Sequence, residues 1–129
     1  MLNNLRRWCS IKRCCVPYNK NYQYTCDRQE LNVKEINYND LLTKIKEGGI
    51  LIDVRNKQEF LEGHLEGAIL IPYYEIRKKI VSIIPNKDQT IILYCQNGGR
   101  SLKAYEILNK IGYANTYNLN GGLERIFHN

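Results

Sequence analysis

Long hydrophobic runs are absent from this chain of 129 residues. No uninterrupted apolar stretch comes near the about 18 residues that a membrane-spanning helix requires, so the body of the protein is expected to be soluble. Histidine is scarce, and neither His64 nor His128 stands in a cluster of metal-ligating residue types; we therefore expect no metal site. With 43% hydrophobic residues the chain can still bury a core, and its length fits one domain.

Acidic residues are missing from the start of the chain, where none precedes Asp27. Residues 1–30 carry a formal charge of +4, whereas residues 31–129 carry only +2 of the total of +6. The body also lacks the dense mixture of basic and aromatic residues that marks a nucleic-acid surface. We therefore expect no nucleic-acid partner.

Cysteine is nearly absent from the body, where Cys95 stands alone. The other four cysteines lie within the first thirty residues, at Cys9, Cys14, Cys15 and Cys26. An odd number of cysteines with two of them adjacent does not resemble a secreted disulfide framework. The pattern favours a reducing compartment, and a cytoplasmic location is expected.

Residues 1–30 show no sustained periodicity, and we interpret them as a basic, poorly ordered extension before a domain at 31–129. Two alternatives stay open. The acid-poor, basic start also fits an organelle (mitochondrial) transit peptide, and acylation of Cys14 or Cys15 would bring the tail into contact with a membrane. Zinc binding by the four cysteines lacks the paired Cys-x-x-Cys spacing.

Short apolar runs alternate with segments of helical periodicity along the body. Strands are expected over residues 33–36, 50–54, 68–71, 91–94 and 116–119. Helices are expected after a cap at Asn39–Asp40, after a capping box of Asn56 and Glu59, from Ile76 to Pro85, from Ser101 to Gly112, and around Leu123, Ile126 and Phe127. This alternation predicts an α/β fold with a mainly parallel five-stranded sheet and helices on both faces.

Residues 90–101 contain the candidate site for nucleophilic chemistry. Cys95 follows a buried strand, and Gly98 and Gly99 let the next loop turn its N–H groups toward one point. A helix then begins, and its positive end favours a thiolate on Cys95. Arg100 adds a cation for an anionic substrate. The alternative is that Cys95 is an inert buried thiol.

The loop Cys95-Gln96-Asn97-Gly98-Gly99-Arg100-Ser101 resembles the active-site loop of the rhodanese family of sulfurtransferases. Further stretches resemble that family in the right order: Ile50 to Arg55, Glu59-Phe60, Gly63 to Ala68, Ile71-Pro72, and Asn118 to Leu123. The match covers about residues 34–127. Ile126 stands where the family usually has tryptophan, which suggests a shortened final helix.

The resemblance implies a sulfurtransferase in which Cys95 takes the outer sulfur of thiosulfate or of a small or protein-bound persulfide. A thiol or cyanide then removes that sulfur, and a thioredoxin-like protein or glutathione is the expected kind of thiol acceptor. No cofactor is required, and a monomer suffices. Because Gln96 stands where the family often has arginine, thiosulfate is less favoured as the physiological donor.

The resemblance also assigns roles around Cys95. Backbone N–H groups that hold the persulfide are expected from Gln96, Asn97, Gly98, Gly99 and Arg100. Ser101 either donates from its hydroxyl or caps the helix. Supporting positions form a second set: Asp53 and Arg55 as an ion pair that braces the crevice, Glu59 sharing Arg55, and His64 in a structural hydrogen bond.

Three other functions compete. A dual-specificity-type phosphatase uses a related cysteine–arginine loop, but four residues separate Cys95 from Arg100 where the phosphatases have five. A regulatory binding module would be expected to lack the cysteine. A redox sensor would need a resolving cysteine, for which Cys26 is a candidate.

Overall fold

The computed structural model describes residues 15–16, 25–26 and 32–127. The chain divides into two units, residues 1–32 and residues 33–129. In the first unit, β1 (Cys15–Val16) pairs antiparallel with β2 (Thr25–Cys26), a pairing that was not expected from the sequence. The expectations of poor order, a transit peptide or acylation fall largely on residues outside the described part and stay predictions.

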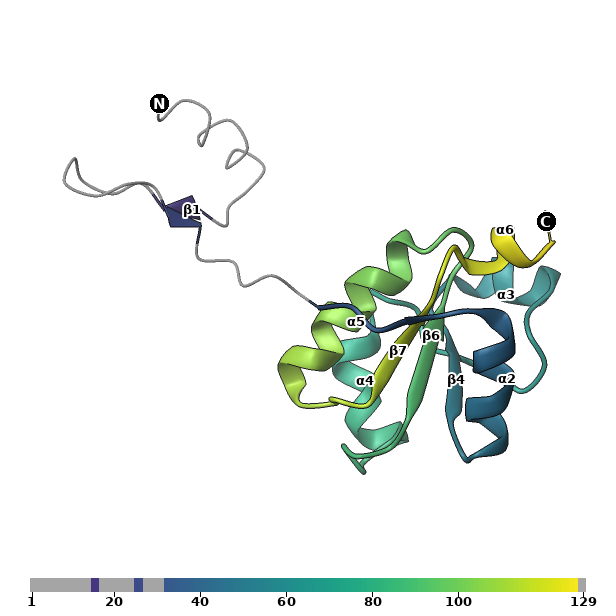
Figure 1. Ribbon diagram of the computed structural model, residues 1–129, viewed down its shortest axis with the longest axis horizontal. Coiled ribbons are helices and arrows are strands. Elements are labelled where there is room, and N and C mark those ends of the chain that lie inside the picture. The colour runs from purple at the N-terminus through teal and green to yellow at the C-terminus, as the bar shows by residue number, and fades with distance from the viewer. Residues whose placement is uncertain (1–14, 17–24, 27–31, 128–129) are drawn as a thin grey trace. The chain divides into compact units, whose positions relative to one another are not determined.

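The second unit contains one five-stranded sheet with the strand order β3-β7-β6-β4-β5 (Figure 1). The strands are β3 (Glu35–Ile36), β4 (Ile50–Asp53), β5 (Ile69–Leu70), β6 (Ile91–Tyr94) and β7 (Thr116–Leu119). Every pairing in this sheet is parallel. The expected α/β fold is therefore confirmed, with β6 at the centre of the sheet and β3 at an edge.

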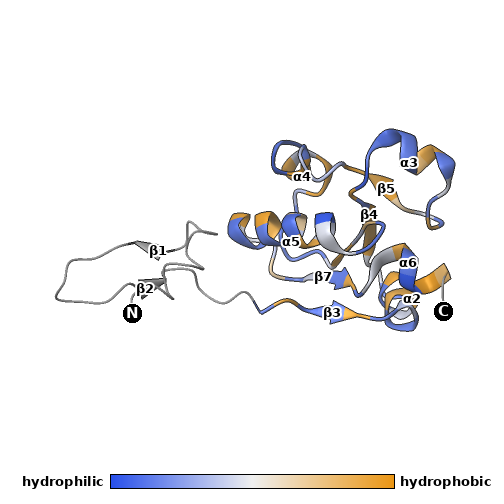
Figure 2. Cartoon of the chain, turned by 90° about the horizontal axis from the view of Figure 1, so that it is seen from above, coloured by the Kyte–Doolittle hydropathy of each residue, from blue (hydrophilic) through white to orange (hydrophobic). Residues whose placement is uncertain are grey.

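Helices cover both faces of this sheet (Figure 1). They are α2 (Tyr38–Lys46), α3 (Lys57–Glu62), α4 (Ile76–Ile83), α5 (Gly99–Ile111) and α6 (Gly122–Phe127). Figure 2 shows that the helices carry hydrophobic and hydrophilic residues side by side, as expected of helices that pack with one face inward. In the described part of the chain, no helix has both the length and the apolar character needed to cross a bilayer.

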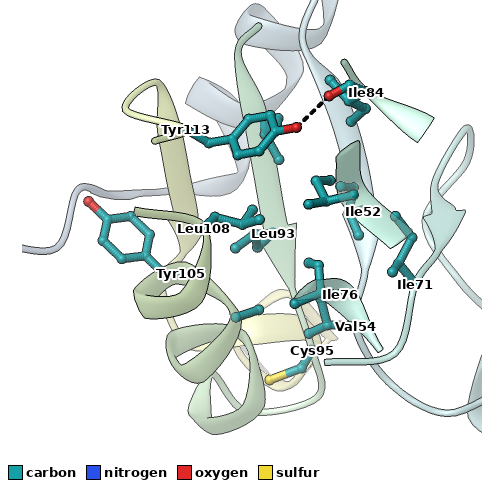
Figure 3. Packing of buried hydrophobic residues seen from close by; sticks show 13 residues of the cluster. Ile52, Val54, Ile71, Ile76, Ile84, Leu93, Cys95, Tyr105, Leu108 and Tyr113 are labelled. Atoms are coloured by element: carbon teal, nitrogen blue, oxygen red, sulfur yellow. Dashed lines mark hydrogen bonds between the residues drawn. The ribbon is translucent and has the colours of Figure 1, made fainter. Parts of the chain in front are cut away.

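Two hydrophobic clusters lie on opposite faces of the sheet, because neighbouring strand residues point to opposite sides. The larger cluster packs strand residues such as Ile52 and Leu93 against α4 and α5 (Figure 3). The smaller one joins Leu51 and Tyr94 to α2 and α6. Cys95 belongs to the larger cluster and lies at the carboxyl end of the central strand.

Several element boundaries differ from those expected: β3 begins at Glu35 instead of residue 33, and β4 ends at Asp53 instead of residue 54. The cap of α2 is Asn37 instead of Asn39–Asp40, since the Asn37 side chain accepts from the amide of Asp40 at 2.8 Å. β5 is shorter than expected because the amide of Ala68 bonds to Leu65 in a turn. α5 begins at Gly99, two residues before Ser101.

Candidate active site

Cys95 directly follows β6, and its side chain is 0% exposed. Its Sγ accepts hydrogen bonds from the amide of Gly98 at 3.0 Å and from the amide of Ser101 at 3.4 Å. The Ser101 Oγ lies 3.5 Å from the same sulfur. Figure 3 shows the sulfur at the end of the large core cluster, directed toward α5. The sulfur thus lies among convergent donors at the positive end of a helix, an environment that suits an anion.

The backbone of Gly98 makes this arrangement possible. Gly98 precedes α5 with φ +104°, a left-handed conformation that residues with a Cβ rarely adopt. Asn97 supports the turn, because its Oδ1 accepts from the amide of Gly99 at 3.1 Å. The interpretation of Ser101 as the helix cap is wrong: Ser101 lies buried in the first turn of α5, where its hydroxyl donates to the carbonyl of Gly98 at 3.2 Å and accepts from the Cys95 sulfur.

Arg100 is not an unpaired cation. Its Nη1 and Nη2 donate to the two carboxylate oxygens of Glu59 at 2.7 and 2.9 Å, a bidentate pair. The hydrogen-bonded partner of Glu59 is thus Arg100, whereas the expected interaction with Arg55 is one of charge alone. The capping box with Asn56 holds Glu59 in the first turn of α3, from which its carboxylate reaches Arg100. The hydrogen bonds from Arg100 lower the pKa of Glu59 from 4.5 to about 2, and Glu59 raises the pKa of Arg100.

Arg55 connects strand β4 with the cysteine loop. It forms the expected ion pair with the fully buried Asp53, with 2.7 Å between Nη2 and Oδ2, and this hydrogen-bonded pairing raises the pKa of Arg55. Its Nη2 also donates to the carbonyl of Gly63 at 2.7 Å, and its Nη1 lies 3.4 Å from Oε1 of Gln96. The side chain of Gln96 is therefore tied to a buried ion pair on the neighbouring strand.

Tyr94 completes this buried network, and sequence reasoning missed it. Its hydroxyl donates to Oδ2 of Asp53 at 2.7 Å and accepts from the amide of Leu65 at 3.0 Å. Burial raises the pKa of Tyr94, so the hydroxyl remains a donor across the neutral range. The available signal was a tyrosine within an otherwise aliphatic buried strand, since a buried hydroxyl requires a partner.

His64 forms the kind of hydrogen bond that was expected, with its Nδ1 2.8 Å from the carbonyl of Phe60. Its ring stacks on the Phe60 ring with 3.7 Å between centroids. Both contacts fix the imidazole within the segment that follows α3. Both contacts fit the structural role that was expected of His64.

A cavity of about 410 Å³ borders the loop at Gln96. Its lining consists of Arg55, Glu59, Glu62, Gly63, His64, Gln96, Leu123 and Phe127. Arg55 of the expected ion pair lines this cavity, whereas Cys95 and Asp53 are fully buried and do not line it. Glu62, Leu123 and Phe127 were not identified from the sequence as site residues, because their place here depends on how α3 and α6 pack. In the described residues, no group of three His, Cys, Asp or Glu side chains is arranged to hold a metal ion.

Comparison with curated proteins identifies relatives of different overall length. Thiosulfate sulfurtransferase PspE of Escherichia coli is 40% identical over 75 residues, which cover 58% of this chain and 71% of that protein. A tRNA uridine(34) hydroxylase of Photorhabdus laumondii is 33% identical over 78 residues, which are 57% of this chain but only 22% of that protein. The similar region therefore also occurs within larger enzymes.

Solved structures similar to this chain include single-domain proteins of the same kind of fold. A rhodanese from E. coli with bound anions matches with a TM-score of 0.57 and 36% identity, covering 62% of this chain and 93% of that one. The human single-domain sulfurtransferase TSTD1 matches with a TM-score of 0.66 at 22% identity over 75% of this chain and 97% of that one, which shows the fold alone. The model of the rhodanese-like domain matches residues 37–128, and this chain belongs to that family.

Proposed function

We propose that this protein is a sulfurtransferase that carries a sulfane sulfur on Cys95. The observation that carries the proposal is the position of Sγ, 3.0 and 3.4 Å from the amides of Gly98 and Ser101 at the start of α5. Such donors stabilise a thiolate, which is the nucleophilic form of cysteine. The similarity to a thiosulfate sulfurtransferase supports the same reaction class.

In the first half-reaction, the Cys95 thiolate attacks the outer sulfur of a donor R–S–SH. The donor's S–S bond breaks, a new S–S bond forms on Cys95, and the electron pair leaves with R–S⁻. With thiosulfate the leaving group is sulfite, and no external oxidant or reductant takes part. The N–H groups of the loop hold the charge of the transferred sulfur, as they do in an oxyanion hole.

In the second half-reaction, an acceptor thiolate or cyanide attacks the terminal sulfur and restores the Cys95 thiolate. The acceptor becomes a persulfide or thiocyanate. A small thiol such as glutathione or a thioredoxin-like protein fits this role, and a reducing compartment would keep such acceptors available. Because the two half-reactions share one residue, donor and acceptor should give ping-pong kinetics.

Intact mass spectrometry tests the proposal. The reduced protein and the Cys95→Ser variant are each incubated with thiosulfate, and separately with cysteine persulfide. We expect the wild type to gain one sulfur atom, about 32 Da, which cyanide removes and the variant lacks. A folded wild-type protein that gains no sulfur from either donor would contradict a sulfurtransferase and favour a regulatory module.

A further inference from the structure

Helix α6 begins directly against the loop that carries Cys95. The amide of Leu123 donates to the carbonyl of Cys95 at 3.0 Å, and the amide of Glu124 donates to the carbonyl of Gln96 at 2.9 Å. Amides in the first turn of a helix have no acceptor within that helix. The cysteine loop supplies those acceptors, so the start of α6 and the loop fix each other.

These two bonds also determine where the loop's own amides point. A trans peptide places its N–H on the side opposite its C=O, and the described residues contain no cis peptide bond. With the carbonyls of Cys95 and Gln96 turned toward α6, the N–H groups of Gln96 and Asn97 are turned away from it. The N–H groups of Gln96 and Asn97, which lie between Cys95 and the sulfur-contacting amide of Gly98, are therefore oriented by a helix from a distant part of the sequence.

Gly122 is what allows α6 to approach so closely. A Cβ at this position would lie 2.6 Å from the carbonyl oxygen of Cys95, and 2.7 Å from both the carbonyl carbon and oxygen of Gln96. All of these are backbone atoms, so relief would require the loop itself to move. The neighbouring Gly121 differs, because the three atoms nearest to a Cβ there, at 2.8 to 3.1 Å, all belong to the side chain of Arg125 on α6 itself.

We propose that Gly122 is a positioning residue for sulfur transfer, which lets α6 hold the peptide planes of the Cys95 loop in the orientation that stabilises charge on the transferred sulfur. The inference rests on the proposed function and assigns a role to a residue outside the loop. Gly122 does not touch the reacting sulfur. It acts through the carbonyls of Cys95 and Gln96.

The two glycines provide a matched pair of variants in the full chain. Gly121 and Gly122 have φ values of +80° and +65°, so alanine is strained at either position. Only Gly122→Ala, however, pushes a methyl group into the loop backbone. At equal donor concentration we expect the fraction of Cys95 persulfide to fall about tenfold in Gly122→Ala and less than about threefold in Gly121→Ala. Equal losses in the two variants, or none in Gly122→Ala, would overturn the proposal.

Alkylation of Cys95 separates this inference from the proposed function, because it needs no sulfur donor. The rate of alkylation by iodoacetamide is measured near neutral pH and in mild alkali. The neutral rate divided by the alkaline rate reports how strongly the site stabilises the thiolate, because differences in access affect both rates equally. We expect the ratio to fall in Gly122→Ala and to stay unchanged in Gly121→Ala. An unchanged ratio in both would reject the positioning role even if the wild type took up no sulfur.

A measurement on the wild type covers the case in which Gly122→Ala does not fold. Cys95 is loaded with sulfur or, if it takes up none, carboxymethylated with iodoacetate, and the backbone amides are followed by NMR. The amide signals of Gln96 and Asn97 should shift, while the amides of Leu123 and Glu124 should keep their protection from hydrogen exchange. Unmoved signals from Gln96 and Asn97, or lost protection of the Leu123 and Glu124 amides, would overturn the proposal that α6 holds the loop in position.

Discussion

At the scale of single residues, the charges around Cys95 are paired. Arg55 is bound to Asp53 and Arg100 is bound to Glu59, so both guanidinium groups near the loop are balanced by carboxylates. The sulfur itself meets backbone amides. Stabilisation of an anion at this site therefore depends on oriented dipoles more than on an unpaired cation.

The pair of Glu59 and Arg100 predicts a pH dependence of stability. Because the folded-state pKa of Glu59 is about 2 instead of 4.5, its contribution is fully present above pH 4.5 and is lost as the pH falls toward 2. We expect Glu59→Gln to lower the free energy of unfolding by about 1 kcal/mol at neutral pH. Urea denaturation across this range should show the two proteins converging in acid.

The exposed pair of Lys79 on α4 and Glu75, the residue that precedes this helix, has its charged atoms 2.6 Å apart and provides a control. Glu75→Gln should change the free energy of unfolding by only a few tenths of a kcal/mol, because exposed i,i+4 pairs contribute about that much. A Glu59→Gln variant that matches Glu75→Gln, or that remains less stable than the wild type below pH 2, would contradict the assignment.

Tyr94→Phe tests the buried network beneath the loop. The change removes a donor to Asp53 and an acceptor for the amide of Leu65. A buried group that loses its partner costs about 1 to 3 kcal/mol, so we expect a loss of about 2 kcal/mol in the free energy of unfolding. Chemical denaturation measures it, and the half-exposed Tyr38→Phe is the control. Equal stability of the two variants would show that the network contributes little.

At the scale of elements, a tyrosine joins the ends of two helices. α5 is capped by Gly112, which has φ +116°, and the next residue, Tyr113, donates from its hydroxyl to the carbonyl of Ile84 at 2.6 Å (Figure 3). Ile84 is the residue that follows α4. The helices on the Cys95 side of the sheet are thus tied at the end remote from the sulfur.

Removal of the hydrogen bond between Tyr113 and Ile84 should lower the free energy of unfolding without affecting sulfur transfer at Cys95. Tyr113→Phe leaves the Ile84 carbonyl without its donor, and we expect thermal unfolding to show a loss of about 1 to 2 kcal/mol. Sulfur loading of Cys95 should remain as in the wild type. Tyr74→Phe, at a position that is 63% exposed, serves as the reference. A drop in sulfur loading of folded Tyr113→Phe would show that this end of the helices communicates with the site.

At the scale of the whole molecule, every described contact of the site lies within residues 33–129. The loop, the two ion pairs and the start of α6 all belong to this unit. The four other cysteines precede it in the sequence. Their side chains lie outside the described part, and pairing of Cys26 with Cys95 stays a hypothesis.

A chain limited to residues 33–129 tests whether the first unit contributes to stability or to sulfur uptake. We expect it to unfold at the same temperature as the full chain and to acquire sulfur on Cys95 at the same rate, because it contains the whole site. The measurements are calorimetry and time-resolved intact mass. Loss of sulfur uptake in the folded short chain would assign a role to the first unit. A disulfide between Cys95 and Cys26 in the oxidised full chain, absent from Cys26→Ser, would support the redox-sensor alternative.

Much of the fold followed from local patterns in the sequence. The β6 run of Ile91 to Tyr94, the capping box of Asn56 and Glu59, and the stop at Gly112 were all expected and are present. Periodicity and turn chemistry act over a few residues, so they can be recognised without the fold. The cap at Asn37 was missed because Asn39 and Asp40 offered the same side-chain chemistry two and three residues later.

The sequence by itself determined the elements and pointed to the candidate nucleophile: an alternation of strands and helices, with Cys95 between a buried strand and a glycine loop. Only the tertiary structure decided which charged and polar groups pair across long separations in the sequence. Glu59 meets Arg100 and Asp53 meets Tyr94 across separations of 41 residues, and α6 reaches back to the carbonyls of Cys95 and Gln96. From the sequence alone, each of these side chains could pair with several others. The packing of α3 and α6 against the sheet brings one particular partner of each within hydrogen-bonding distance.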